Sequence, residues 1–335
     1  METPCGAVPR AKTSLSTRDK LGTLRARVGV IRNRYNLNPG LYCVGSPRDQ
    51  SPVLVTANYK LSFDSLRQEL STIDAWILVV DTRGINVWCA AGKGTFSDDE
   101  IAMQVQKTRL SDIVAHRELI LPQFAAPGVA SYKLKKKCGF KARFGPIRAV
   151  DLLEYLSNGQ HADEKMRTVT FTFGERLILT PVEIYLFWKP FLFITLAILV
   201  LSGLGPDFYS ISTAINRGMF AIGATIVAML TGALVTPVFL PWIPGRQFWW
   251  KGALAGSLTG FGYIILNNAL FTTVEAFSLW SWIVAGTSYL AMNFTGATPY
   301  TSLSGVKKEM QQGLPVQCGV TFLALLLWLA SPFIS

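Results

Sequence analysis

The sequence predicts an α/β domain followed by an all-α transmembrane bundle of five helices. Half of the 335 residues are hydrophobic, only 16% are charged, and the mean hydropathy of the chain is +0.32. Soluble domains rarely combine a positive mean hydropathy with so few charged residues. The charges are also uneven, because residues 1–183 hold 26 Lys/Arg and 18 Asp/Glu whereas residues 184–335 hold 6 and 3. We therefore expect a polar, disordered N-terminus at 1–22, a cytoplasmic α/β domain at 23–180 and the transmembrane domain at 181–335.

The first part of the α/β domain contains segments of strand length. Leu24–Val30 alternates apolar with basic residues, which favours a strand. Leu41–Val44 and Val53–Ala57 are short apolar runs, and Phe63–Leu70 reads as a helix with a serine N-cap before it. Ala75–Asp81 is a continuous aliphatic run ended by charge, which is typical of a strand buried on both faces of a parallel sheet.

The rest of the domain continues this alternation. A capping-box pattern at Ser97–Glu100 predicts a helix that runs to about Thr108. Further elements are expected as a strand at Glu118–Leu121, helices at Val129–Lys137 and Arg148–Leu156, and a hairpin of Thr168–Phe173 with Arg176–Leu179. Strands that alternate with helices predict a largely parallel sheet with a ligand crevice at the carboxyl ends of its strands. The turns after Val55 and after Asp81 are therefore the places to look for a site.

Apolar stretches near the length of a membrane span, about 20 residues, follow Pro181. We place them at Ile184–Leu204, Ile215–Phe239, Trp250–Phe271, Ala276–Phe294 and Val316–Ile334. The basic residues of the short loops are Arg246, Lys251, Lys307 and Lys308, and the positive-inside rule puts those loops and the α/β domain in the cytoplasm. The first 20 residues lack an apolar run, which agrees with the absence of a cleaved secretory signal. We expect a multi-pass protein of the cytoplasmic (inner) membrane whose spans serve as an anchor.

The cysteine pattern narrows the chemistry. The five cysteines are Cys5, Cys43, Cys89, Cys138 and Cys318, all far apart and without a Cys-x-x-Cys pair. This spacing disfavours both a disulfide framework and a cysteine-based zinc or iron–sulfur site in this chain. The chain has only two histidines, so a redox metal would have to arrive within its own scaffold. The basic residues also lack the interleaved aromatic residues of nucleic-acid binding proteins.

The peptide at residues 84–95 is the most unusual in the chain. It ends in Gly-Lys-Gly-Thr, but Val87 and Gly94 stand where a phosphate-binding loop needs Gly and Ser or Thr. If residues 86–93 form a short helix, one face carries Asn86, Cys89, Gly92 and Lys93. A sulfur beside a residue without a Cβ suits a broad planar partner, and a thiolate presented to a macrocycle suits axial ligation of its metal. The alternative is a buried cysteine that acts as a small apolar residue, which the neighbouring Asn, Gly and Lys disfavour.

Residues 86–93, Asn-Val-Trp-Cys-Ala-Ala-Gly-Lys, resemble the cap-helix motif of the HgcA family, the membrane corrinoid proteins of the microbial mercury-methylation pair. The order of parts, a domain of this size and then five spans, also resembles that family. The resemblance implies a Rossmann-like corrinoid-binding domain with a cap helix, similar to that of the corrinoid iron–sulfur protein of the acetyl-CoA pathway. It further implies a cobalamin-type corrinoid with cobalt, Cys89 as its lower axial ligand and catalytic group, and methyl transfer to Hg(II) to form methylmercury.

The sequence departs from related proteins in two motifs, and the second departure bears on the partners. The common corrinoid motif Asp-x-His-x-x-Gly is absent, since His116 follows Asp112 by four residues. A four-cysteine cluster site like that of the acetyl-CoA pathway relative is also absent, so electrons must come from another polypeptide. The resemblance implies that this partner is a ferredoxin-like, HgcB-like protein with two 4Fe–4S clusters, and that a folate-linked methyl donor system remethylates the cofactor.

The resemblance assigns the cofactor-binding cap to Asn86, Val87, Trp88, Cys89, Ala90, Ala91, Gly92 and Lys93. Asn86 is placed to cap the helix and Trp88 to anchor its back, although both roles are also purely structural ones. Lys93 either neutralises the cofactor rim or the thiolate, or is solvated. Thr56, at a sheet end, is a further candidate contact or a turn cap. Two other functions stay open, namely a membrane-tethered corrinoid methyl carrier with a different acceptor, and a non-enzymatic membrane scaffold or transporter.

Overall fold

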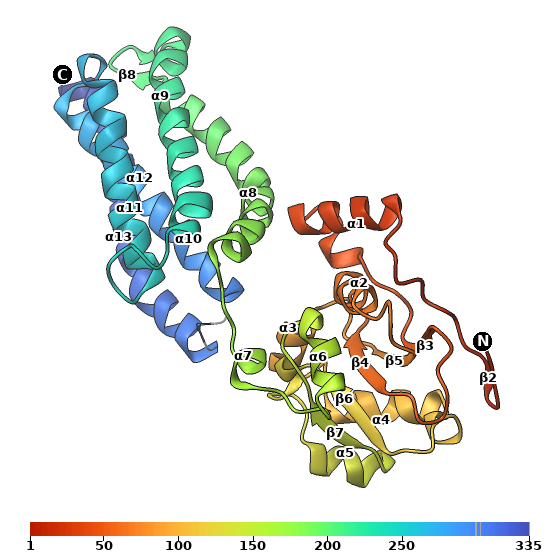
Figure 1. The fold of residues 1–335 in the computed structure, drawn as a ribbon. Coiled ribbons are helices and arrows are strands. Elements are labelled where there is room, and N and C mark those ends of the chain that lie inside the picture. Colours follow the sequence, from red (N-terminus) through yellow and green to blue (C-terminus); the bar gives the residue numbers. More distant parts are fainter. Residues whose placement is uncertain (299, 302, 335) are drawn as a thin grey trace. The chain divides into compact units, whose positions relative to one another are not determined.

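The computed structural model describes residues 1–298, 300–301 and 303–334. The chain divides into two compact units, Met1–Thr170 and Phe171–Ser335. The first is an α/β domain with a mixed sheet, and the second is helical (Figure 1). The second unit begins ahead of the predicted boundary at residues 180 and 181.

The first unit alternates strands with helices from residue 40 onward. Its strands are β1 (Glu2–Thr3), β2 (Gly6–Ala7), β3 (Gly40–Val44), β4 (Val53–Ala57), β5 (Ala75–Val80), β6 (Glu118–Leu121) and β7 (Lys141–Phe144). Its α-helices are α1 (Thr17–Val28), α2 (Lys60–Gln68), α3 (Val87–Gly92), α4 (Asp98–Lys107), α5 (Ser131–Cys138), α6 (Leu152–Ser157) and α7 (Glu164–Arg167). Its 3-10 turns are η1 (Arg32–Arg34), η2 (Leu110–Asp112), η3 (Gln123–Ala125) and η4 (Ala149–Asp151).

The central sheet has the strand order β3-β5-β4-β6-β7. β3 runs antiparallel to β5, whereas β4 pairs in parallel with β5 and β6, and β6 in parallel with β7. Every residue of β4 and β5 is buried, as expected for apolar runs covered on both faces. The carboxyl ends of the parallel strands therefore meet at one edge of the sheet, where β5 leads into α3.

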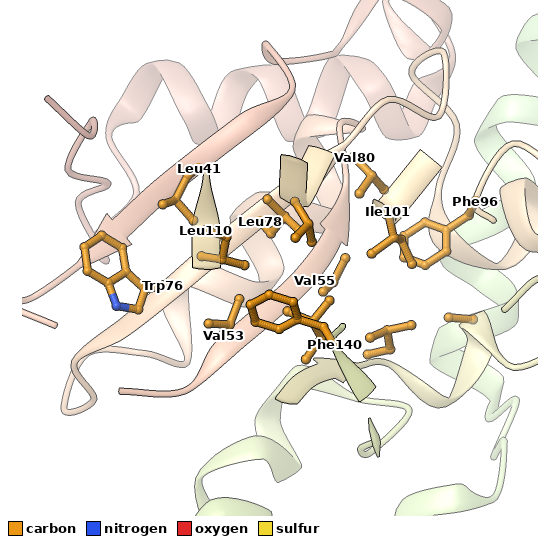
Figure 2. Close-up of a cluster of buried hydrophobic side chains, with 14 of the residues drawn as sticks. Leu41, Val53, Val55, Trp76, Leu78, Val80, Phe96, Ile101, Leu110 and Phe140 are labelled. Atoms are coloured by element: carbon orange, nitrogen blue, oxygen red, sulfur yellow. The ribbon is translucent and has the colours of Figure 1, made fainter. Parts of the chain in front are cut away.

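Alternate residues of the buried strands feed two cores. On one face, Val55 of β4 and Leu78 of β5 join Ile101 of α4 and Phe140 (Figure 2). On the other face, residues such as Ile77 pack in a second cluster that α2 and α6 complete. The sheet is thus held on both sides, and its helices are fixed relative to its edge.

The N-terminal segment differs from the sequence-based expectation. Residues 1–22 were expected to be disordered and Leu24–Val30 to form a strand, but the structure has a β1–β2 hairpin and helix α1. Ser16 caps α1 in a reciprocal capping box with Asp19, and Gly29 ends it at φ 112°. The strand prediction was wrong because a short alternating window carries less weight than these two end signals.

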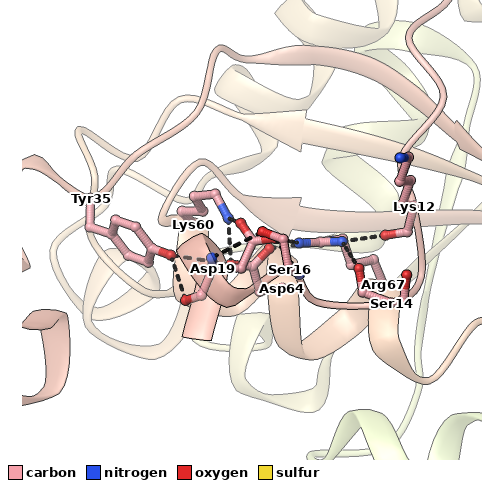
Figure 3. A network of polar contacts seen from close by, with 8 residues as sticks. All are labelled: Lys12, Ser14, Ser16, Asp19, Tyr35, Lys60, Asp64 and Arg67. Carbon is pink, nitrogen blue, oxygen red and sulfur yellow. Dashed lines mark hydrogen bonds and ion pairs between the residues drawn. The ribbon is translucent and has the colours of Figure 1, made fainter. Parts of the chain in front are cut away.

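A polar network fastens α1 to α2 (Figure 3). Lys60 Nζ lies 2.6 Å from both Asp19 Oδ1 and Asp64 Oδ2. Arg67 Nε donates to Asp64 Oδ1 at 2.7 Å, and a second guanidinium nitrogen lies 3.0 Å from Asp19 Oδ2. Arg67 also donates to the carbonyl of Lys12. Two cations and two carboxylates therefore share one partly dry site, so that each buried charge is compensated.

This network predicts acid-dependent stability. Burial on its own would raise the pKa of Asp19, but hydrogen bonds from Lys60, Ser16 and Arg67 hold that pKa well below its usual range. The stabilisation is present above the unfolded pKa of about 4 and is lost as the pH falls further. Asp19→Asn should lower the free energy of unfolding near pH 7 by about 1–2 kcal/mol, and should flatten its fall in acid.

The measurement is urea unfolding of the full chain in detergent, followed by circular dichroism from neutral pH down to about pH 3. Asp49→Asn is the matched control, because Asp49 is exposed and has no ion pair within the described part of the chain. An Asp19→Asn protein with the pH slope of the unchanged chain would refute this role.

The second unit consists mainly of long helices. Its elements are α8 (Phe173–Ser202), β8 (Leu204–Gly205), β9 (Phe208–Tyr209), α9 (Ile211–Leu230), η5 (Thr231–Val235), α10 (Thr236–Val238), α11 (Phe248–Leu266), η6 (Asn268–Leu270), α12 (Thr273–Asn293), η7 (Phe294–Ala297) and α13 (Leu303–Ile334). Among the described residues, three helices are long and apolar enough to cross a membrane, at Phe173–Ser202, Ile211–Val238 and Ser304–Ile334. α11 and α12 overlap the predicted third and fourth spans, but they are not among these three helices. The five spans therefore remain a prediction.

Two local features of this unit bear on the sequence analysis. The expected hairpin over residues 168–179 is wrong, because Thr172 and Glu175 form a capping box that starts α8 at Phe173. Glycines let two helices of this unit pack closely. A Cβ on Gly252 would lie 2.8 Å from Ser288 Cα, and one on Gly256 would lie 3.0 Å from Val284 Cα. Glycine therefore lets α11 and α12 approach backbone to backbone.

Candidate functional site

Helix α3 is the short helix expected after β5. Asn86 is its N-cap, and the Asn86 side-chain oxygen accepts a hydrogen bond from Cys89 N at 2.9 Å. Val87, Ala90 and Ala91 point into the core. Because these three residues take up the inner side, the remaining face of α3 is turned away from the sheet.

The outer face of α3 is open around a single sulfur. Cys89 is half-buried and belongs to neither core cluster, and Gly92 and Lys93 are exposed. A Cβ built on Gly92 would meet nothing within 4 Å. Within the described residues the Cys89 thiol has no hydrogen-bond partner. A flat ligand therefore has room on this face beside Gly92.

A hollow of about 350 Å³ lies at the carboxyl ends of β4, β6 and β7, next to the start of α3. Four of the sequence-predicted residues line it, namely Thr56, Asn86, Val87 and Trp88. Cys89, Ala90, Ala91, Gly92 and Lys93 lie outside its lining. The ring of Trp88 contacts Phe124, another wall residue, at a centroid distance of 6.1 Å. Trp88 is thus the residue through which α3 contributes an aromatic ring to the wall of the hollow.

Polar groups without partners face or border the hollow. The Thr56 hydroxyl has no hydrogen bond among the described residues, although Thr56 is only 4% exposed. Tyr59 also lines the hollow, but its hydroxyl is completely buried, without a partner in the same part of the chain, and does not open onto the hollow. Burial raises the pKa of Tyr59, so the phenol keeps its proton and remains a donor. Arg148, on the rim, is exposed and supplies a cation.

Asn58, at the end of β4, holds the loop that delivers α3. Its side-chain oxygen accepts hydrogen bonds from Thr82 N and Gly84 N at 3.0 Å, and from the Thr82 hydroxyl at 2.9 Å. Its amide nitrogen donates to Asp81 at 2.9 Å. Arg83 and Gly84 have φ values of 59° and 73°, so this loop needs such support. Asn58 is not evident as a site residue from the sequence, because its only local signal is its position after a buried strand.

A glycine supports α3 from behind. A Cβ on Gly128 would lie 2.9 Å from Ala91 Cα and 3.0 Å from the Ala91 carbonyl oxygen. The segment before α5 therefore packs directly on the backbone of α3, which only a glycine permits. The backbone amides of Thr95 and Phe96 both donate to the carbonyl of Ala90 at the other end. α3 is thus fixed at its start, its back and its end, and open in front.

Helix α5 carries a run of four lysines, Lys133, Lys135, Lys136 and Lys137. Lys137 pairs with Asp98 and Asp99 of α4, so its charge is compensated. Lys133, Lys135 and Lys136 are exposed. Only this part of the run is available as a basic surface.

The geometry fits a broad flat ligand that carries side groups. Such a ligand can lie on the open face of α3, where Cys89 offers a soft sulfur donor and Gly92 leaves space. The hollow is near the lower limit for small-ligand pockets, about 300 Å³, so it suits a side group rather than a whole macrocycle. Thr56 and Arg148 would meet the polar atoms of that group.

Part of the first unit is similar to known proteins. Residues 31–153 match the family model described as the CO dehydrogenase/acetyl-CoA synthase delta subunit. The acetyl-CoA decarbonylase/synthase complex subunit gamma of Methanopyrus kandleri is 32% identical over 127 residues, which are 37% of this chain and 27% of that protein. The subunits of the same name from Methanocaldococcus jannaschii and Methanosarcina acetivorans are 35% identical over 92 residues and 33% over 120. Those alignments cover 27% and 35% of this chain, and 19% and 25% of the relatives.

The matched region contains β3 through η4, and hence α3 and the hollow. The second unit lies outside it. The chain spans about a quarter of the length of the curated relatives it matches. Residues 31–153 are thus similar to subunits of acetyl-CoA decarbonylase/synthase complexes.

Proposed function

We propose that the first unit binds a cobalamin-type corrinoid and that the chain is a corrinoid-dependent methyltransferase. The single observation that carries the proposal is the open Cys89 face of α3 beside a hollow with unpaired polar groups. The resemblance of residues 86–93 to the cap helix of membrane corrinoid proteins supports it. The similarity to acetyl-CoA decarbonylase/synthase subunits also supports it. The motif at residues 86–93 independently implies a domain similar to the corrinoid iron–sulfur protein of the acetyl-CoA pathway.

Each residue of the site has a physical task in this proposal. Cys89 would hold the cobalt through its sulfur, and Gly92 keeps the outer surface of the helix low beside it. Asn86 fixes the first turn, so that the sulfur is presented in one orientation. When bound, the corrinoid supplies a cobalt centre that carries a methyl group and releases it to an acceptor.

The hollow would hold the side groups of the cofactor. Thr56 supplies a hydroxyl, Arg148 attracts an anionic group, and Trp88 with Val87 closes the apolar wall. Lys93, exposed at the end of α3, lies where it can neutralise the thiolate or a polar rim.

Hg(II) is the acceptor we propose. A thiolate such as Cys89 donates electron density to the metal it binds, which favours release of a methyl group with its electrons to an electrophile. Hg(II) is such an electrophile, and the product is methylmercury. A different physiological acceptor is the alternative. Hg(II) and other electrophiles offered in parallel to methylated protein would separate the two, because a methyl carrier of general use would not prefer Hg(II).

The partners follow from this chemistry. A ferredoxin-like protein with two 4Fe–4S clusters would supply electrons, and a folate-linked system would supply methyl groups. Lys133, Lys135 and Lys136 offer an acidic redox partner a basic surface on α5. We propose that the first unit is cytoplasmic and that the second is embedded in the inner membrane. If the purified protein contains no stoichiometric cobalt and shows no corrinoid spectrum, the alternative of a non-enzymatic membrane scaffold or transporter is favoured instead.

The Gly92 position gives a sharp test of the docking face. Gly92→Ala should leave the fold intact, and should even add about 0.5–1 kcal/mol of helix stability, because its new methyl group meets only open space. The same methyl group would stand under a flat ligand, so we expect corrinoid affinity to fall about tenfold, and further in Gly92→Leu. The measurement is equilibrium loading of the full chain with corrinoid, followed by visible absorbance.

Gly262→Ala is the matched control. A Cβ there also meets nothing within 4 Å, and Gly262 lies in α11 of the second unit. It should add a similar amount of helix stability and leave corrinoid loading unchanged. Unreduced loading in both Gly92 variants would show that the cofactor does not lie on this face.

A further inference from the structure

Helix α1 turns its large apolar side chains outward. Leu21 and Leu24 are 54% and 59% exposed. The inner side of the helix carries small residues instead, because Ala26 is buried and a Cβ on Gly22 would lie 2.8 Å from a ring carbon of Tyr35. A single exposed leucine is ordinary, but two leucines one turn apart on the same helix form an apolar patch. The outer face of α1 is therefore a candidate docking surface.

The polar network holds these leucines in their outward position. Asp19 lies on the inner side of α1, where it pairs with Lys60 at 2.6 Å and with Arg67 at 3.0 Å (Figure 3). A rotation of α1 that buried Leu21 and Leu24 would pull Asp19 out of this network and leave two cations short of a carboxylate. α1 also lies on the outside of the first unit (Figure 1). The outward apolar face is thus a fixed property of the folded unit.

Cations flank the leucines on both sides. Helical spacing places Arg18 and Arg25 along one side of the apolar strip and Lys20 along the other. All three are exposed, and none of them forms an ion pair in the part of the chain that the structure describes. An apolar strip between two rows of cations is typical of a helix that lies in the surface of an anionic membrane. The leucines then enter the acyl boundary, while the Lys and Arg stems reach back to the head groups.

The charge of the segment favours an anionic surface. Residues 10–40 contain eight Lys or Arg and one acidic residue, Asp19, whose charge is already compensated within the network. An acidic protein would match this charge as well, but the same chain carries three helices long and apolar enough to cross a membrane. Such helices would tether the first unit beside a bilayer, so that lipid head groups are present at a high effective concentration. Lipid is therefore the occupant that the chain itself supplies with a tether.

We propose that the outer face of α1 docks on an anionic membrane surface, with its two leucines in the interface and its three flanking cations on lipid phosphates. Docking of this face would restrict the orientation of the first unit beside the membrane. The inference rests on the proposed membrane location of the second unit. It does not rest on the corrinoid, because no residue of α1 lies on α3 or lines the hollow.

The experiment is hydrogen–deuterium exchange, read by mass spectrometry, of the full chain in nanodiscs that hold one chain each. One set of nanodiscs contains phosphatidylcholine alone, and the other adds the anionic lipid phosphatidylglycerol. We expect the amides of α1 to exchange about tenfold more slowly in the anionic set, because opening of the helix then requires its release from the lipid. High salt should reduce this ratio, since it screens the cations.

Two variants separate the parts of the face. The triple substitution Arg18→Gln, Lys20→Gln and Arg25→Gln should bring the ratio between the two lipids close to one. Leu21→Gln combined with Leu24→Gln should lower it to about threefold, because the charges remain and the apolar anchor is lost. All five side chains are exposed, so the fold of the first unit should survive both changes.

The matched control removes the same charge from another helix of the first unit. It combines Lys133→Gln, Lys135→Gln and Lys136→Gln, three exposed positions of α5, and should keep the tenfold ratio. Equal exchange in the two lipids, a full ratio that survives the triple substitution in α1, or a ratio lost in the α5 control would overturn the proposal.

The other occupants of this face are distinguished by the same measurement. Protection that is equal in both lipids and grows with the number of chains per nanodisc would assign the face to a second copy of the chain, and so refute lipid docking. A chain that does not enter nanodiscs would refute the membrane location together with this inference. An embedded chain whose α1 is not protected by anionic lipid would refute the inference alone.

Discussion

Cys89→Ala is expected to change the visible spectrum of the corrinoid-loaded protein and to lower methyl transfer to Hg(II) by about a hundredfold or more. The sulfur is the single soft donor on the open face of α3, and loss of an outer-shell partner of a metal ligand alone costs about 10–100-fold. Cys89→His should give a third spectrum, because imidazole donates less electron density than a thiolate. Absorbance of loaded protein and methylmercury formation are the two readouts.

The fold should survive both substitutions. Cys89 is half-buried, lies outside both cores and makes no side-chain hydrogen bond in the described structure, so the free energy of unfolding should change by less than about 1 kcal/mol. Cys318→Ala in α13 is the control for general thiol effects and should alter neither readout. Spectra that remain unchanged in both Cys89 variants would exclude ligation by this sulfur, whatever happens to activity.

The parts of the site that are local in sequence could be predicted. The continuous aliphatic run of residues 75–80 predicts β5, and the Asn86 cap with the small residues after it predicts α3. The sulfur, the glycine and the lysine fall on one face because helical spacing alone determines that. These features need no knowledge of which strands are neighbours.

The hollow could not be predicted in the same way. Its wall combines the ends of β4, β6 and β7 with α2 and α3, and only the strand order brings these together. β7 has four residues with alternating exposure, too short and too polar to stand out as a strand. Tyr59 and Arg148 therefore joined the site only with the tertiary structure. Thr56 was identified because it lies at the sheet end that any parallel sheet presents.

The helical unit shows where hydropathy stops being informative. α11 and α12 pack through Gly252 and Gly256 against serine and valine backbone, so small residues rather than large apolar ones make their close contact. A helix that packs against protein requires less apolar surface than one that faces lipid. Length and composition therefore identify α8, α9 and α13 more readily than the two helices that pack most closely.

Asn58→Ala is expected to have the largest effect on stability, about 2–5 kcal/mol. The Asn58 oxygen satisfies the buried backbone N–H groups of Thr82 and Gly84, and each group left unpaired costs about 1–3 kcal/mol. Asp81 would lose a donor as well. The loop before α3 would then relax from its left-handed conformation, so corrinoid loading should weaken even in protein that remains folded.

Asn58→Asp separates the two halves of this role. It keeps the acceptor for Thr82 and Gly84 but sets a carboxylate against Asp81, 2.9 Å from the replaced nitrogen. Near neutral pH it should therefore destabilise the first unit, and the loss should shrink in mild acid as one carboxylate takes up a proton. Asn158→Ala, at the exposed end of α6, should have no effect in urea unfolding at either pH. Were Asn58→Ala as stable as Asn158→Ala, the loop would have to be held by other contacts, and α3 would owe its position to Gly128 and the core alone.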